Sequence, residues 1–147
     1  MVREPLPQKE YEAIFSKVPR LTVEVVIVSA NEGVLLSRRQ AGPCRGLWHI
    51  PGGTVRFGEL LTEAARRVPR GEIGLEVDVG PMIGYIEYPS HLELGDWPVG
   101  IAFRAAPSPT GPSPAFSHPG LVAWFAECPD EMHEEQKAFL RTHALAS

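Results

Sequence analysis

Residues 49 to 75, which read HIPGGTVRFGELLTEAARRVPRGEIGL, constrain the fold more than any other part of this sequence. A short apolar segment ends at Gly52 and Gly53. Glycines let a backbone carbonyl or amide come close to an ion or a phosphate, because they have no Cβ. A helix is predicted from about residue 59 to residue 68, and Pro69 with a nearby glycine is expected to end it early. The stretch therefore predicts a strand, a tight turn and a helix, in that order.

Hydrophobic periodicity and turn residues predict the other elements. Helices are expected over residues 8–18 and 129–142, and strands over 21–28, 34–39, 47–50, 75–88, 99–106 and 121–127. Because Gly80-Pro81 interrupts the fourth of these strands, that segment is either one long strand or a hairpin. Residues 107–120 contain five prolines and predict an exposed loop. The 147 residues therefore predict a single domain, 1–147, of the α/β or α+β class, with helices packed on a mixed sheet.

Composition excludes several classes of function. The net charge of −4 argues against a general nucleic-acid-binding surface. Cys44 and Cys128 are the only cysteines, too few for a disulfide framework and, by themselves, for a zinc site. No apolar run approaches the ~20 residues of a membrane span, and the N-terminal residues MVREPLPQKE lack the apolar core of a signal peptide. We therefore expect a reduced, cytoplasmic protein that binds neither nucleic acid nor membrane.

The spacing of residues 53 to 75 resembles the Nudix box, in which Gly, five residues, Glu and seven residues precede Arg-Glu-apolar-any-Glu-Glu-any-Gly-apolar. Six positions of that pattern are matched, by Gly53, Glu59, Arg67, Glu72, Gly74 and Leu75. The flanks are also similar, since GLWHIPGG resembles the family's strand and turn before the box, and VAWF with the helix after it resembles its last strand and terminal helix. The resemblance implies a Nudix-type α/β/α sandwich and a Mg²⁺-dependent hydrolase of a small nucleotide substrate.

Two glutamates of the box are missing, because Val68 and Gly71 stand at their positions. Helix positions 68, 71 and 72 share one face, on which three carboxylates would hold several Mg²⁺ ions against a diphosphate. Glu72 is the carboxylate that remains there, and Glu59, on the other side of the predicted helix break, is not expected to help it. One carboxylate is sufficient for one Mg²⁺, which often uses one or two carboxylates together with waters and substrate phosphates.

The box is most similar to the divergent GDP-mannose mannosyl hydrolase branch of the family, which lacks the same two glutamates. That similarity implies a single Mg²⁺, a nucleoside diphosphate sugar such as GDP-mannose as substrate, and attack at the sugar carbon. It implies that the metal is held by a backbone carbonyl of Gly52 or Gly53, by the Glu72 carboxylate and by Ser117.

The same similarity points to residues that would contact the substrate. His118 is the candidate general base, Arg39 the candidate phosphate clamp, and Glu24 the candidate contact to the nucleotide or sugar. Glu24 lies in an apolar strand, where an unpaired acid is costly, so it either faces the ligand cleft or pairs with an arginine. Arg67 either takes part in catalysis or orients the box by pairing with a carboxylate. His91 is a second candidate in the cleft.

The remaining histidines are predicted to hold structural positions. His49 is expected to be a strand residue that faces a layer of the fold, and His133 and His143 are expected to lie on a helix surface. Of the neighbouring Arg38 and Arg39, one is expected to be simply exposed.

Two other functions stay open at this point. Val68, Gly71 and Ser117 favour a nucleotide-binding Nudix module that has no catalytic activity. Alternatively, Glu59 and Glu72 with an acid from elsewhere would make an ordinary diphosphohydrolase that cleaves at phosphorus. A homodimer could form through the N-terminal helix and the first strand.

Overall fold

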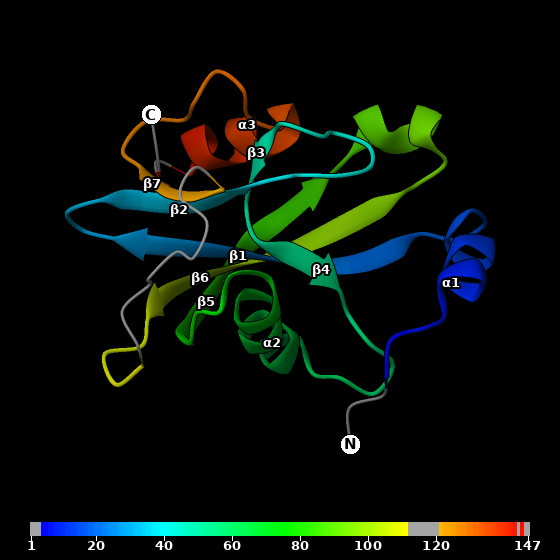
Figure 1. Cartoon of the computed structure of the whole chain (residues 1–147), viewed down its shortest axis with the longest axis horizontal. Coiled ribbons are helices and arrows are strands. Elements are labelled where there is room, and N and C mark those ends of the chain that lie inside the picture. The colour runs from blue at the N-terminus through cyan, green and yellow to red at the C-terminus, as the bar shows by residue number, and fades with distance from the viewer. Residues whose placement is uncertain (1–3, 112–120, 144, 146–147) are drawn as a thin grey trace.

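The computed structural model describes residues 4–111, 121–143 and 145, and in this part of the chain a seven-stranded mixed sheet carries helices on both faces (Figure 1). The elements, in chain order, are α1 (Gln8–Phe15), β1 (Arg20–Ser29), β2 (Gly33–Arg38), β3 (Trp48–His49), β4 (Gly52–Thr54), α2 (Leu61–Ile73), β5 (Val77–Glu87), the 3₁₀-helix η1 (Pro89–Leu94), β6 (Pro98–Pro107), β7 (Val122–Phe125) and α3 (Glu134–Thr142). The strand order is β3-β2-β1-β6-β5, with β4 paired to β1 and β7 paired to β2. The predicted α/β/α sandwich with a mixed sheet is confirmed.

β1 lies at the centre of the sheet because both of its faces are apolar. Val23, Val25 and Ile27 are fully buried on the face that α2 covers, and Val26 is fully buried on the face that α3 covers. The strand runs parallel to β6 and antiparallel to β2 and β4. Since successive side chains of a strand point to opposite faces, Glu24 shares the α3 face with Val26.

The predicted end of the central helix at residue 68 is wrong, because α2 continues through Pro69 and Gly71 to Ile73. A proline inside a helix removes one backbone hydrogen bond and crowds the turn before it. Pro69 is fully buried here, so packing offsets that loss. Gly74 then ends the helix with a left-handed φ of 67°, a conformation that glycine adopts without strain. Glu72 is therefore the last acidic residue of one continuous helix.

The C-terminal helix also begins later than predicted, at Glu134. The residues before it pair with β3 in an extended conformation. The Trp48 N–H donates to the Glu131 carbonyl over 2.8 Å, and the His133 N–H donates to the Trp48 carbonyl over 3.0 Å, around a parallel bridge between Trp48 and Met132. Trp48 and Met132 are both buried, so this pairing also removes apolar surface from water. As a result, His133 precedes the helix instead of lying on its outer surface.

The segment around Gly80-Pro81 belongs to one strand, β5, and not to a hairpin. β5 pairs with β6 along its length, and its register shifts on either side of Met82 absorb the interruption. Among the helices of the described residues, none has the length and hydropathy needed to cross a lipid bilayer.

Candidate functional site

A cavity of about 400 Å³ opens on the α3 side of the sheet. Its walls come from α1, β1, the loop between β2 and β3, the two glycines of β4, η1 and the start of α3. This volume falls in the range of known small-molecule sites. Charged and polar side chains from several of these segments line the cavity, so a polar or ionic ligand is favoured.

Glu24 lines this cavity from the centre of β1. Its carboxylate, only 5% exposed, accepts hydrogen bonds from the Thr22 hydroxyl at 3.0 Å and from the Tyr88 hydroxyl at 3.1 Å. Gln136 of α3 in turn donates to the Tyr88 oxygen at 2.9 Å. Burial raises the pKa of Glu24 to about 7, and the two hydroxyl donors and the charge of Arg20 limit that rise. Glu24 was expected either to face a ligand cleft or to pair with an arginine. The structure shows the first, because Glu24 lines the cavity and no arginine of the described residues forms an ion pair with it.

Glu72, near the end of α2, lies beside Gly52. The tight turn predicted at Gly52 and Gly53 is wrong, because both residues belong to strand β4 and pair with β1. The Glu72 Oε1 accepts hydrogen bonds from the Ser37 hydroxyl at 2.7 Å and from His49 Nε2 at 2.9 Å. Its Oε2 accepts only a longer one, 3.3 Å, from the Gly52 N–H. The Glu72 side chain is 27% exposed, so Oε2 keeps capacity to bind an ion.

His49 and Ser37 are site residues that the sequence did not identify. They are direct partners across the β2–β3 ladder, which brings both side chains to the Glu72 carboxylate. The prediction for His49 was that it faces a layer of the fold, whereas its ring lies at the cavity. The signal that could have found it is the hairpin register, since that alone places His49 opposite Ser37.

Gly52 connects the two acidic groups. The residue is the partner of Glu24 across the β1–β4 ladder, and a Cβ at this position would collide with Glu24 Oε2. Its N–H points to Glu72 Oε2. Two carboxylates thus converge on the start of β4, where the two glycines have no side chains. Carboxylate and carbonyl oxygens are the ligands that Mg²⁺ prefers, so the donor set fits one such ion.

Arg67 is held inside the box and does not line the cavity. Its guanidinium donates to both oxygens of Glu59, at 2.7 and 2.9 Å, and to the Thr54 carbonyl at 2.9 Å. The bidentate pair lowers the pKa of Glu59. Arg67 thus pairs with a carboxylate, as expected if its role is to orient the box. It also commits Glu59 to that arginine, which leaves Glu59 unavailable to a metal at Glu72.

The neighbouring arginines at the end of β2 differ in their surroundings. Arg38 donates to the Gly46 carbonyl at 2.9 Å and to Glu131 at 2.8 Å. Arg39 is exposed and lines the cavity, where a guanidinium can bind a phosphate through two parallel hydrogen bonds.

His91 lines the cavity from η1, as expected for a cleft residue. The prediction that His133 lies on a helix surface is wrong, because this side chain is only 6% exposed and lines the same cavity. Burial lowers the pKa of His133 to about 4, so its ring is neutral at physiological pH. His143 is exposed at the end of α3.

Ser117 and His118 lie outside the described residues. Their predicted roles as metal ligand and general base therefore stay predictions.

The NUDIX domain family model matches residues 18–141. A low-salt glycan biosynthesis protein from Haloferax volcanii is 42% identical over 83 residues, which cover 56% of this chain and 53% of that protein. An ADP-ribose pyrophosphatase from Methanocaldococcus jannaschii is 34% identical over 71 residues, covering 48% of this chain and 41% of that protein. The chain thus spans about half the length of these curated relatives.

The fold is similar to that of a solved MutT NUDIX hydrolase from Burkholderia pseudomallei, with a TM-score of 0.73 and 23% identity. The match covers 85% of this chain and 98% of that one. At this identity the likeness shows the fold alone.

Proposed function

The chain belongs to the Nudix family, and we propose that it is a one-Mg²⁺ hydrolase that releases the sugar of a nucleoside diphosphate sugar by attack at the sugar carbon. The observation that carries the proposal is the contact of Glu72 with Gly52 at the start of β4, while Val68, at the position of a missing box glutamate, is buried in the core. The box therefore supplies carboxylate ligation for one ion rather than for a cluster. The similarity to a protein named for glycan biosynthesis supports a sugar-containing substrate.

The residues that would hold Mg²⁺ are Glu72 and the carbonyl of Gly52 or Gly53, with Ser117 as the predicted third ligand. Bound there, the ion would neutralise charge on the diphosphate of the substrate. Ser37 and His49 fix the orientation of the Glu72 carboxylate through Oε1 and so present Oε2 to Gly52. Outer hydrogen bonds of this kind tune the ligands of metal sites.

Arg39 would bind the phosphates within the cavity that it lines. Its exposed guanidinium lines the cavity and has a charge that can offset the negative charge developing on a departing nucleoside diphosphate. Arg38 cannot take this role, because it is engaged by the Gly46 carbonyl and Glu131.

Cleavage at carbon fits a site with few metal ligands. Attack at the phosphorus of a diphosphate commonly recruits two metal ions. At the sugar carbon, the bond to the diphosphate oxygen breaks, the nucleoside diphosphate departs, and the carbon gains oxocarbenium character while a water molecule activated on the opposite face adds to it. His118 is the predicted base for that water. Glu24 is a second candidate, because a cavity carboxyl with a pKa of about 7 can accept a proton at physiological pH.

The test is hydrolysis of a panel of nucleoside diphosphate sugars in ¹⁸O-labelled water, with mass spectrometry of both products. Label in the free sugar, with inversion at the anomeric carbon, supports the proposal. Label in a phosphate product would overturn it and assign the chain to the ordinary diphosphohydrolases, the alternative favoured by the ADP-ribose pyrophosphatase relative. Binding of GDP-mannose and Mg²⁺ without any product would instead support the non-catalytic module.

The base is identified by variants in the same assay. His118→Ala should retain substrate binding and lose turnover if His118 takes the proton. An unchanged rate in this variant, with a loss in Glu24→Gln, would transfer the role to Glu24. The cytoplasmic location and the homodimer stay predictions, for which fractionation and light scattering are the direct measurements.

A further inference from the structure

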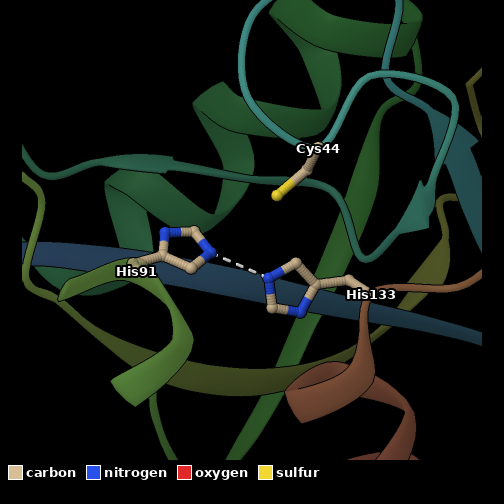
Figure 2. Close-up of side chains that lie close together, drawn as sticks. All are labelled: Cys44, His91 and His133. Carbon is tan, nitrogen blue, oxygen red and sulfur yellow. Dashed lines mark hydrogen bonds between the residues drawn. The ribbon is translucent and has the colours of Figure 1, made fainter. Parts of the chain in front are cut away.

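Cys44, His91 and His133 meet at one wall of the cavity although they are far apart in the sequence (Figure 2). Cys44 comes from the loop between β2 and β3, His91 from η1, and His133 from the residue before α3. The sulfur and one nitrogen of each ring all lie within 4.8 Å of one another. None of the three belongs to the Nudix box or to the set proposed to hold Mg²⁺.

The two imidazole rings face each other through their Nε2 atoms, 2.8 Å apart. Without a metal, this contact is a hydrogen bond in which one ring donates its Nε2 proton to the other. The other nitrogens lie near carboxylates but beyond hydrogen-bonding distance, His91 Nδ1 at 3.8 Å from Asp96 and His133 Nδ1 at 3.9 Å from Glu135, and the buried His133 Nδ1 has no hydrogen-bond partner among the described residues. A nearby carboxylate favours the tautomer that carries its proton on Nδ1, and a ring in that tautomer has its Nε2 lone pair available to a metal ion.

Both carboxylates are themselves held in place. Asp96 accepts two hydrogen bonds from Arg20, at 3.0 and 2.7 Å. Glu135 accepts hydrogen bonds from the Ser90 N–H at 3.0 Å and from the Ser90 hydroxyl. Histidines that bind metals commonly donate a hydrogen bond from their second nitrogen to a fixed carboxylate, which sets the tautomer and increases the basicity of the ligating nitrogen. Asp96 and Glu135 are carboxylates that lie beside these two rings, at 3.8 and 3.9 Å.

Cys44 supplies a third donor of a different kind. Figure 2 shows its sulfur directed toward the gap beside the two rings. The residue has a φ of 65°, and among the described residues it is the one non-glycine residue with a positive φ. The turn that follows is closed by a hydrogen bond of 3.1 Å from the Leu47 N–H to the Cys44 carbonyl. The chain thus adopts an uncommon backbone conformation at the position that brings the thiol to the histidines.

We propose that Cys44, His91 and His133 form a transition-metal site that binds Zn²⁺, with its fourth coordination position open to the cavity. One thiolate and two imidazoles are a ligand set typical of zinc and poorly suited to Mg²⁺. In a tetrahedral site with Zn–N distances of about 2.0–2.1 Å the two nitrogens are separated by about 3.3 Å, so the rings need to move apart by only about half an ångström. The Cys44 sulfur, which lies within 4.8 Å of the ring nitrogens, needs to approach them to about 3.6 Å to complete the site.

The open position gives the site a direct connection to the ligand. Zinc sites with three protein ligands complete their tetrahedron with a water molecule or an oxygen of the substrate. Here that oxygen would come from whatever occupies the cavity between Glu24 and Arg39. The site does not depend on the proposed hydrolysis, since its ligands and its metal preference are separate from those of the Glu72 site.

The test uses the full chain after treatment with a chelator. Zn²⁺ is titrated against a chromophoric chelator at pH 7.5, and Co²⁺ replaces it for absorption spectroscopy. We expect one Zn²⁺ per chain, and for Co²⁺ a thiolate charge-transfer band together with the intense visible bands of tetrahedral coordination. Cys44→Ser should remove the charge-transfer band and weaken Zn²⁺ binding by at least about tenfold, the scale on which even outer-shell changes act.

Cys128→Ser is the matched control. Cys128 is the other cysteine of the chain, buried in the core cluster on the α3 face and not part of the cavity wall. This variant should bind both metals as the parent does. His91→Gln, at a half-buried position, gives a second ligand variant, with circular dichroism to confirm that each protein is folded. The proposal is overturned if no stoichiometric Zn²⁺ binds, if Cys44→Ser binds as the parent does, or if Co²⁺ gives an octahedral spectrum without a thiolate band.

Discussion

The hydroxyl of Tyr88 donates a 3.1 Å hydrogen bond to the buried carboxylate of Glu24. The donor stabilises the charged carboxylate, yet burial dominates and raises the pKa of Glu24 to about 7. Glu24 is therefore divided between its charged and neutral forms at physiological pH. A ligand that donates a hydrogen bond to Glu24 would select the charged form, and one that accepts from it would select the neutral form.

Glu24→Gln should make the protein more stable at alkaline pH. The pKa of Glu24 is about 7 in the folded state and about 4.5 in the unfolded chain, where the carboxyl is exposed to water. Between these values the folded state binds more protons, so stability falls as pH rises from about 4.5 to 7. Removing the charge should raise the free energy of unfolding by on the order of 3 kcal/mol above pH 7. Urea unfolding at pH 5 and pH 8 measures this, and a variant no more stable than the parent at pH 8 would contradict it.

In protein kept free of metal, His133→Gln should remove a pH dependence of stability that opposes the one due to Glu24. Burial lowers the pKa of His133 from 6.5 to about 4, so between these values the unfolded state binds more protons and stability rises with pH. The windows of Glu24 and His133 overlap with opposite signs, so the parent should vary little between pH 4.5 and 6.5. In His133→Gln the fall due to Glu24 should become visible. A parent and variant with the same pH profile would disprove this compensation.

Glu72→Gln should abolish metal-dependent activity and leave the fold intact. An amide cannot supply the negative oxygen that binds Mg²⁺, although it can still accept the hydrogen bond from Ser37. We expect turnover at saturating Mg²⁺ to fall by more than about tenfold, a barrier increase above ~1.4 kcal/mol. Glu76→Gln is the control, because Glu76 pairs with Arg70 on the surface, away from the cavity. If Glu72→Gln and Glu76→Gln lose the same amount of turnover, Glu72 is not a metal ligand.

Val68→Glu should not create a site for several metal ions. Val68 is 5% exposed and packs with Ala64 and Ala65 in the core, so a carboxylate there would be buried without a partner and should lower the unfolding free energy by more than ~2 kcal/mol. Val68→Gln separates the effect of size from that of charge. Metal titration and a diphosphatase assay complete the experiment. An additional tightly bound ion together with new diphosphatase activity would show that the face can hold a cluster.

The parts of the site that follow from local sequence were predictable. The spacing from Gly53 to Leu75 identifies the box, and the apolar run around Glu24 places a carboxyl in a central strand. Both depend on residues close together in the chain, where periodicity and turn chemistry are informative.

The parts that depend on long-range pairing were not predictable in this way. His49 reaches Glu72 because the β2–β3 register sets it opposite Ser37. His133 was misplaced because helical periodicity does not reveal that Trp48 pairs with the residues before α3. The end of α2 was predicted too early since the burial that compensates Pro69 arises only in the folded protein.

The packing of Val68 also has an evolutionary consequence. Its methyl group lies so close to β4 that a Cβ on Gly53 would be 3.1 Å from it, so the apolar side chain supports the very strand that lines the cavity. A mutation of Val68 to glutamate therefore passes through a less stable protein before any second substitution can provide a metal ligand. A second acid on this face is difficult to acquire one mutation at a time, so descendants of this chain would diversify around the single carboxylate of Glu72.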